Sequence, residues 1–295
     1  MAVLELRDVS IRFGGLQALS SLSLSVGEWE IVGLIGPNGA GKTTAFNCIT
    51  GFYRPTSGQV FYRGDDVTTL PPHRKSQLGI GRTFQNVGMV KTVSARENLK
   101  IAQHSLAEYG PMSGVLGTPV SLATERELAE RADLILELIG LADVPEVPIG
   151  ALPYGTLKLL ELGCALATDP EILLLDEPSS GMGPDEAHAL GERLLSLRKE
   201  LGLTMLLIEH HVPLVVGVCD YVYVLNFGQL LTEGRPDDVR RHPEVVAAYL
   251  GGEAPDALAA THETAEDAAL AAATAPTAGG GRRRTRRQAS AKEEK

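Results

Sequence analysis

The sequence lacks the segments that would carry a chain into or across a membrane. No stretch of its 295 residues approaches the ~20 consecutive apolar residues that span a bilayer. Residues 1–6 have neither a basic region nor a long apolar run, so we expect no secretion signal. These absences predict a cytosolic protein, or one that a partner holds at a membrane.

Cysteine is scarce. Cys48, Cys164 and Cys219 are odd in number and far apart, and each lies in an apolar stretch. This pattern favours packed thiols in a reducing compartment over disulfides or a metal site.

A basic surface and a coiled-coil repeat are also lacking. The chain has 27 Lys and Arg against 37 Asp and Glu, a formal net charge of −10, which argues against nucleic-acid binding through a general basic surface. No heptad pattern is sustained. With 44% hydrophobic and 22% charged residues, the composition is that of a soluble globular protein of one large or two small domains.

A glycine-rich run supplies the strongest positive signal. It fits the phosphate-loop pattern at every fixed position and consists of Gly36, Pro37, Asn38, Gly39, Ala40, Gly41, Lys42, Thr43 and Thr44. Its glycines allow a tight turn whose N–H groups point at phosphate oxygens. Lys42 can reach the β- and γ-phosphates, and the Thr43 hydroxyl can ligate Mg²⁺. The apolar residues 29–35 predict a strand before the loop, and residues 44–50 predict a helix after it, so we expect an ATP site here.

The rest of the pattern predicts an α/β protein. Residues 9–13 and 21–26 alternate around a Gly14-Gly15 turn, which predicts antiparallel strands with one solvated face. From Pro170 onward, strands at residues 172–175, 203–208 and 221–225 alternate with helices, one of them opened by Pro184. Such alternation predicts a parallel sheet with helices on both faces.

A helical insertion is expected between these parts, over residues 88–160. Ser94 with Glu97, and Thr124 with Glu127, have the spacing of a capping box. One apolar stripe stops at Gly140 and consists of Leu128, Ala132, Ile135, Leu136 and Ile139.

Two acids end the strand at residues 172–175. Adjacent acids are commonly only a solvated strand end, but here they follow four aliphatic residues in a chain that has a phosphate loop. Asp176 would hold Mg²⁺ through water, and Glu177 would orient and deprotonate the attacking water. The pair predicts ATP hydrolysis.

The composition changes near residue 253. We expect one domain over residues 1–252 and a disordered, Ala-rich tail over residues 253–295 that ends in an arginine cluster at residues 282–287. The cluster fits a solvated tail, and the alternative is contact with anionic lipid or RNA.

Further motifs follow the phosphate loop in a fixed order. Gln85 precedes the helical stretch, residues 152–156 precede the acid pair, residues 179–182 follow it, and His210 ends a later strand. Over residues 3 to about 250 the series resembles the nucleotide-binding domain of ABC ATPases, whose Q-loop, signature, Walker B, D-loop and switch histidine stand in this order. The resemblance implies a P-loop NTPase with an N-terminal antiparallel β part, a RecA-like parallel-sheet core and a helical subdomain.

A narrower resemblance is to the ATP-binding subunits of branched-chain amino-acid importers. It rests on residues 51–58 and 81–86, with support from residues 97–99 and 102–104. Urea and other amide importers share much of this pattern.

The resemblance also implies an assembly and further site residues. Two such domains pair head to tail, from identical or different chains, and ATP lies between the phosphate loop of one and the signature of the other. Gln85 would sense Mg²⁺ and link it to the helical subdomain, His210 would contact the γ-phosphate, and Phe13 would stack on adenine. His211 is an alternative to His210. Taken alone, Phe13 would be a core aromatic and Gln85 a surface amide. The implied partners are membrane permease subunits and, indirectly, an extracytoplasmic solute-binding protein, with the chain at the cytoplasmic face of the plasma membrane.

The signature departs from the family's pattern. It consists of Leu152, Pro153, Tyr154, Gly155 and Thr156. Pro153 replaces a serine and so removes one hydroxyl donor to the opposing γ-phosphate, and Thr156 replaces a glutamine. Pro153 can still open a helix, and the Gly155 amide is retained. Tyr154 is familiar in the importer branch, whereas His211 stands where that branch usually has Asp.

These observations predict the ATP-hydrolysing subunit of an importer of a small polar solute, with branched-chain or other amino acids as the first expectation and urea or amides as the alternative. A soluble ABC ATPase of translation or DNA maintenance is a rival, although such proteins usually have two cassettes or a long coiled coil. A regulatory protein with little turnover is a third possibility, which Glu177 disfavours and Pro153 keeps open.

Overall fold

The computed structural model describes residues 2–83, 89–103 and 119–250. They belong to the unit Met1–Ala254, which the pattern of contacts separates from Pro255–Lys295. The second unit lies outside the described residues, as does the tail predicted for residues 253–295. Gln85 lies outside them too.

An antiparallel sheet begins the fold. It has the strand order β2-β1-β4-β5 and comprises β1 (Ala2–Phe13), β2 (Leu16–Gly27), β4 (Ser57–Tyr62) and β5 (Asp65–Asp66). Burial alternates along β2, as the period-two pattern predicts, because only one face meets the core. In β1 the alternation is interrupted where its register with β2 shifts. The predicted strand pair around Gly14-Gly15 is confirmed.

A six-stranded sheet forms the centre, in the order β10-β9-β3-β8-β7-β6. Its members are β3 (Ile31–Ile35), β6 (Ile80–Arg82), β7 (Ile172–Asp176), β8 (Thr204–Ile208), β9 (Tyr221–Asn226) and β10 (Gln229–Gly234). Every pair is parallel except β9 with β10. Every residue of β3, β7 and β8 is buried, which explains why these strands are apolar without alternation.

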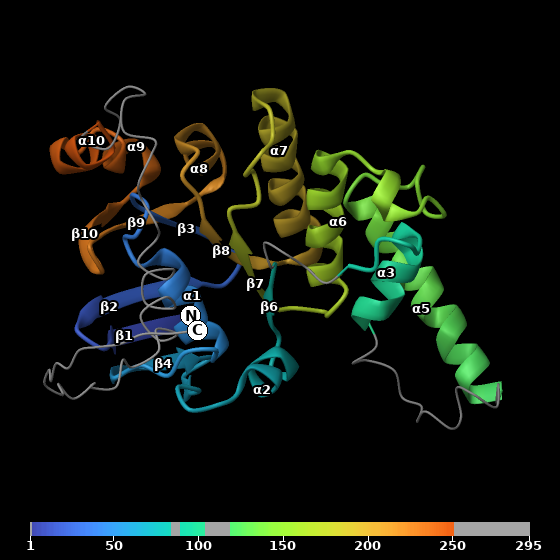
Figure 1. Ribbon diagram of the computed structural model, residues 1–295, viewed down its shortest axis with the longest axis horizontal. Coiled ribbons are helices and arrows are strands. Elements are labelled where there is room, and N and C mark those ends of the chain that lie inside the picture. Colours follow the sequence, from blue (N-terminus) through green and yellow to red (C-terminus); the bar gives the residue numbers. More distant parts are fainter. Residues whose placement is uncertain (1, 84–88, 104–118, 251–295) are drawn as a thin grey trace, which may run out of the picture. The chain divides into compact units, whose positions relative to one another are not determined.

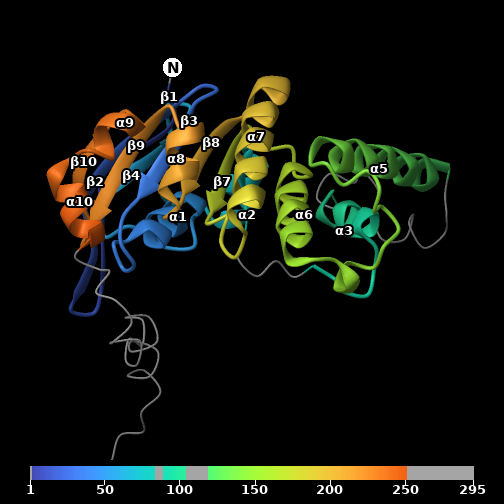
Figure 2. The ribbon, with the colours of Figure 1, turned by 90° about the horizontal axis from the view of Figure 1, so that it is seen from above.

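Two hydrophobic clusters lie on opposite faces of this central sheet. Val32, Leu174 and Leu206 pack toward the antiparallel sheet and α1 (Lys42–Thr50). The neighbouring Leu173 and Leu207 point to the other face, where they join α7 (Pro184–Leu201) and α8 (Val212–Val218). The two layers are visible in Figures 1 and 2, with α1 on one side of the sheet and α7 and α8 on the other.

The predicted helical insertion is present in the described residues. It comprises α3 (Ala95–Ala102), α5 (Pro119–Leu138), the short 3₁₀ helix η2 (Ile149–Ala151) and α6 (Tyr154–Leu166). These helices pack on one another, and α6 also contacts β6. Figure 1 shows α3, α5 and α6 together beyond the β6 edge of the sheet. All five residues of the predicted apolar stripe are buried.

Several short helices complete the described chain. They are α2 (Pro72–Gln77), α9 (Pro236–Val239) and α10 (Pro243–Leu250). Among the described residues, no helix has the length and apolar character that crossing a membrane requires. All three cysteines are free and buried, as predicted.

Two predicted boundaries are wrong. Thr124 is not a helix cap, because it lies inside α5 and its hydroxyl donates to the Val120 carbonyl at 3.1 Å. The strand predicted from residue 29 begins at Ile31, since Trp29 has a φ of 60° and is 66% exposed. In contrast, Ser94 does cap α3, and its Oγ accepts the N–H of Glu97.

Candidate functional site

The phosphate loop connects β3 to α1 through three glycines in left-handed conformations. Their φ angles are 151° at Gly36, 77° at Gly39 and 100° at Gly41. A Cβ at Gly36 would lie 2.2 Å from the Leu225 carbonyl oxygen, and one at Gly41 would lie 2.7 Å from that of Ala18. Because backbone approaches so closely, no other residue fits at these two positions.

A distant turn supports this loop. Gly228, between β9 and β10, donates its N–H to the Ala40 carbonyl at 2.9 Å and accepts the N–H of Ser20 at 2.8 Å. Pro37 closes the loop from within by accepting the Ala40 N–H at 3.1 Å. The loop is therefore held between β2 and the turn that joins β9 to β10.

The start of α1 can receive an anion. Gly41 precedes the helix and no side chain caps it, so the first-turn N–H groups face the loop. Asn38 and Thr43 are exposed, whereas Ala40 and Thr44 are buried. The exposed Thr43 hydroxyl is accessible to a ligand.

Lys42 lies folded over the loop. Its Nζ donates to the Gly36 carbonyl at 2.7 Å and to the Pro37 carbonyl at 3.0 Å. Burial lowers the pKa of the ammonium, and the negative charges of Glu177 and Asp176 oppose that shift. The buried ammonium suits a strongly anionic ligand, since phosphate oxygens would replace the loop carbonyls as its partners.

The acid pair lies at the carboxyl end of β7. Asp176 Oδ2 accepts an N–H from Arg82 Nη2 at 2.7 Å, while Oδ1 is buried and makes no hydrogen bond within the part of the chain described. Glu177 has a φ of 48°, and its N–H donates to the Ile208 carbonyl at 3.0 Å. Such a backbone conformation costs about 1–3 kcal/mol and is concentrated at functional sites.

The residues fit a divalent cation that phosphates help to bind. Among the described residues, no cluster of three or more His, Cys, Asp or Glu could hold a metal by itself. Mg²⁺ needs no such cluster, because one or two carboxylates and phosphate oxygens usually suffice. Asp176 Oδ1 has no hydrogen-bond partner within residues 2–83, 89–103 and 119–250, and Thr43 offers an accessible hydroxyl.

Sequence reasoning assigned Arg82 no role. Its guanidinium is 8% exposed, and it bonds Asp176 on one side and Asn47 Oδ1 of α1, at 2.6 Å, on the other. The next residue, Thr83, accepts the Asp176 N–H at 3.1 Å. Residues 82 and 83 thus hold both the carboxylate and the backbone of Asp176, immediately before the segment that contains Gln85.

The two candidate histidines follow β8, whose last residue pairs with Asp176. The His210 side chain is 55% exposed, with Nδ1 4.0 Å from Glu209 Oε2. His211 is half-buried at the start of α8, and its Nδ1 is buried with no hydrogen bond to any described residue. His210 is therefore the more accessible of the two to a ligand at the carboxyl edge of the sheet.

Phe13 ends β1 and is 40% exposed. Its ring meets Tyr53 edge to face, with the centroids 5.0 Å apart. The exposed part of the ring can stack on a base.

The signature segment opens α6. Pro153 is the N-cap, and its carbonyl accepts the Leu157 N–H at 3.0 Å, so the proline starts the helix without a side-chain cap. Leu152, Gly155 and Thr156 are half-buried, and Tyr154 is 53% exposed. A Cβ at Gly181 would lie 2.7 Å from the Tyr154 ring, so the signature packs against the loop that follows the acid pair.

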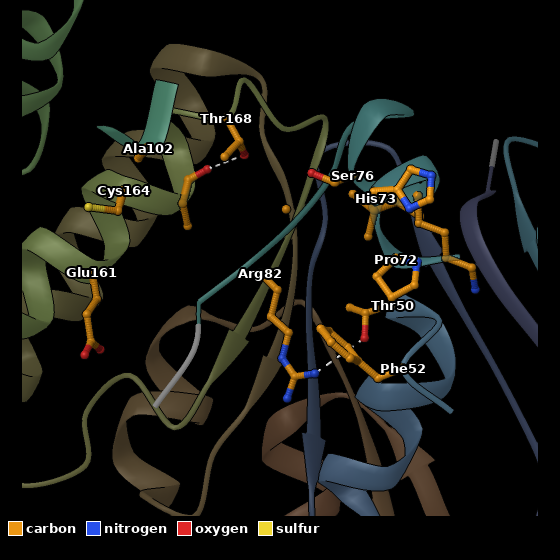
Figure 3. Close-up of a pocket in the computed structure, with 14 residues that line it drawn as sticks. Thr50, Phe52, Pro72, His73, Ser76, Arg82, Ala102, Glu161, Cys164 and Thr168 are labelled. Carbon is orange, nitrogen blue, oxygen red and sulfur yellow. Dashed lines mark hydrogen bonds between the residues drawn. The ribbon is translucent and has the colours of Figure 1, made fainter. Parts of the chain in front are cut away.

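A hollow of about 370 Å³ lies where the insertion meets the core. Thr50 and Phe52 line it from the end of α1 and the turn after it, Pro72 and His73 from α2, and Glu161 and Cys164 from α6. Figure 3 shows Arg82 between these groups, with its hydrogen bond to Thr50 drawn. The same arginine that binds Asp176 therefore also lines this hollow.

Comparison with known proteins gives a consistent result. The family described as "ABC transporter" matches residues 19–180, and the family described as "Branched-chain amino acid ATP-binding cassette transporter" matches residues 229–255. The chain is 43% identical to the high-affinity branched-chain amino acid transport ATP-binding protein LivG of Salmonella typhimurium, over 84% of this chain and 98% of the relative. It is 42% identical to BraF of Pseudomonas aeruginosa, a protein of the same description, with the same coverage.

Solved structures agree. A nucleotide-free ATP-binding cassette from an ABC transporter is 34% identical, with a TM-score of 0.75 over 84% of this chain and 99% of that one. A cassette in its ADP conformation gives the same identity and TM-score over 85% and 99%.

Proposed function

The chain belongs to the ABC transporter family as an ATP-hydrolysing subunit coupled to transport, and we propose that it drives the uptake of branched-chain amino acids. The observation that carries the solute class is the match to LivG and BraF over 98% of their length. The match of residues 229–255 to the branched-chain family adds support from a second region.

We assign the chemistry as follows. The N–H groups of the phosphate loop and α1 bind the phosphates of ATP, and Lys42 neutralises their charge. Mg²⁺, when bound by Thr43 and Asp176, supplies further charge compensation at the β- and γ-phosphates. Glu177 orients the attacking water and accepts its proton, and His210 binds the γ-phosphate. Gln85 is assigned to the metal from its place in the motif series alone.

The complete site needs a second cassette. Phe13 holds the adenine, and residues 152–156 of one chain face the phosphates bound by its partner, in a head-to-tail pair. The uncapped start of α6 supports this role, because its N–H groups are available to an anion. The partner is a second copy or a related chain.

Membrane attachment is through a permease. Arg82 lines the hollow between α2 and α6 and donates a hydrogen bond to Asp176. A permease segment bound in this hollow would therefore contact the arginine that positions Asp176. This arrangement keeps the chain at the cytoplasmic face of the membrane, with a solute-binding protein on the opposite side.

The test is transport by the purified complex. Permease subunits that copurify from gently solubilised membranes are reconstituted with this chain, and uptake of leucine, isoleucine and valine is compared with uptake of urea. We expect ATP-dependent uptake of the amino acids, abolished by Lys42→Ala. Uptake of urea alone would overturn the solute class, and a chain that copurifies with no permease would overturn the transport role.

A further inference from the structure

Glu209 is a fully buried carboxylate between the two catalytic loops. It is 0% exposed and directly follows β8. Its Oε1 accepts the N–H of Ser179 at 2.9 Å, and its Oε2 accepts those of His210 at 3.1 Å and His211 at 3.2 Å. One side chain therefore binds the loop after β7 to the loop after β8.

This contact suits a side chain with two oxygen acceptors. Burying a polar group is costly unless hydrogen bonds replace its water, and three backbone donors do so here. A carboxylate is acceptor-only, so both oxygens can face N–H groups. A glutamine of the same shape would turn an NH₂ group toward one of these donors. Packing alone therefore does not account for a glutamate at this position.

The two loops carry the groups assigned to hydrolysis. Glu177 lies two residues before Ser179, and a turn in which Ser180 N–H donates to the Glu177 carbonyl at 3.1 Å joins them. His210 is itself one of the three donors. Any shift of one loop relative to the other must therefore break a charge-assisted hydrogen bond in a dry environment.

We propose that Glu209 is a positioning residue that fixes Glu177 and His210 relative to each other, so that the two loops move as one unit. The proposal rests on the hydrolytic role assigned above. Glu209 does not touch the nucleotide in this scheme and acts only through its neighbours.

The test is Glu209→Gln in the full chain. A misplacement of about 1 Å can cost about 10²-fold in rate, so we expect kcat for ATP hydrolysis to fall roughly 10–100-fold. Affinity for a fluorescent ATP analogue should change less than about twofold, because the phosphate loop is untouched. Hydrogen exchange should accelerate in both loops together.

Asp220→Asn is the matched control. Asp220 Oδ2 also accepts a backbone N–H, that of Ile31 at 2.9 Å. Ile31 is the first residue of β3, so this contact lies at the end of the strand away from the phosphate loop. This variant should keep kcat and the exchange of both catalytic loops. A Glu209→Gln protein with wild-type kcat, or with faster exchange in the loop after β8 alone, would overturn the proposal.

Glu209→Asp covers the case in which the glutamine variant does not fold. It keeps the charge but is one methylene shorter, so we expect it to retain the adjacent His210 contact and release Ser179. Its kcat should fall while its Tm stays close to wild type, and an unchanged kcat would again count against the proposal. If wild type itself hydrolyses no ATP, the assigned function fails, whereas the exchange result still tests the link between the loops.

Discussion

At the scale of single residues, surroundings separate the roles of two adjacent acids. Asp176 is buried against Arg82 and keeps one oxygen without a hydrogen-bond partner among the described residues. Glu177 leaves the strand in a left-handed conformation and is less buried. These surroundings support the roles proposed above, in which Asp176 holds a cation and Glu177 orients the attacking water.

Replacing Glu177 by Gln should retain ATP binding and lose turnover. The amide cannot accept the proton of the attacking water, so we expect a loss of about 10²–10⁴-fold in kcat. Phosphate release by the purified chain and titration with an ATP analogue measure the two properties. A near wild-type rate would show that another group is the base.

Replacing Arg82 by Met should lower the free energy of unfolding. The pair with Asp176 is buried, with side chains 8% and 4% exposed, and removing one partner of such a pair costs about 3–5 kcal/mol. Urea denaturation measures the loss. The double variant Arg82→Met with Asp176→Asn should recover part of it, because the uncompensated charge is gone.

Arg63→Met is the control for the Arg82 variant. Arg63 pairs with Glu28 at 3.1 Å and also with Glu171, all three side chains are at least one-third exposed, and surface pairs contribute about 0–1 kcal/mol each. Equal losses from both variants would mean that burial does not strengthen the pair at Asp176.

Residues that act together within one short stretch can be identified from the sequence alone. The phosphate loop is found because its glycines, Lys42 and Thr43 act within one short run. Arg82 and Glu209 are not found, because the bonds that matter join them to Asp176 and Ser179, 94 and 30 positions away. Their only signal in the sequence is that they stand beside the Q-loop and the switch histidine.

At the scale of elements, the two ends of α1 suit groups of opposite charge. Its N-terminus is left without a cap for an anion, and its C-terminus is closed by a buried lysine. Lys75 Nζ donates to the carbonyls of Cys48 at 3.2 Å and Ile49 at 2.8 Å. The side chain therefore satisfies two carbonyls of the last turn, which would otherwise lack intrahelical partners.

Lys75 should make stability depend on alkaline pH. Burial lowers its pKa to about 8, whereas the unfolded chain keeps the ordinary value near 10.5. Between these values the unfolded state binds more protons, so this lysine's contribution to the unfolding free energy rises with pH, by about 1–3 kcal/mol across the window. Below pH 8 the full cost of burying the charge is present.

The measurement is urea denaturation of wild type and Lys75→Met at pH 7.5 and 9.5. The unfolding free energy of wild type minus that of Lys75→Met should be larger at the higher pH. An unchanged difference at the two pH values would show that burial does not lower the pKa of this lysine.

The sequence predicts the type of most helices and strands, but it predicts where they begin and end less well. Strongly periodic segments such as residues 128–139 and the strands around Gly14-Gly15 are confirmed, because their burial follows one face. The short strand β6 has only three residues and owes its existence to pairing with β7. Thr124 has cap chemistry, yet the helix begins five residues earlier at Pro119 and continues through it.

At the scale of the whole molecule, Pro153 affects whether the two ATP sites of a head-to-tail pair are equivalent. In the head-to-tail pair proposed above, residues 152–156 would complete the partner's site, whereas the partner's signature would complete the site formed by Lys42, Asp176 and Glu177. Pro153 starts α6 but offers no hydroxyl. We therefore expect a mixed pair in which the site facing this signature is the slower one.

Pro153→Ser should raise hydrolysis at the partner's site by adding a hydrogen-bond donor, a contribution of about 0.5–1.5 kcal/mol. The assay uses the reconstituted pair with Glu177→Gln silencing this chain's own site. A rate that does not rise, or full activity of this chain as a homodimer, would contradict the asymmetry.

The support that Gly228 gives the phosphate loop has a consequence for the chain during its synthesis. Ala40 leaves the ribosome early, but the turn that bonds it, and the β9 backbone that packs on Gly36, are made almost 190 residues later. At about 5–20 residues per second, that delay is roughly ten to forty seconds. A nascent chain therefore carries its most conspicuous motif without the partners that shape it. It follows that ATP can stabilise the folded loop only after the turn at Gly228 has been synthesised.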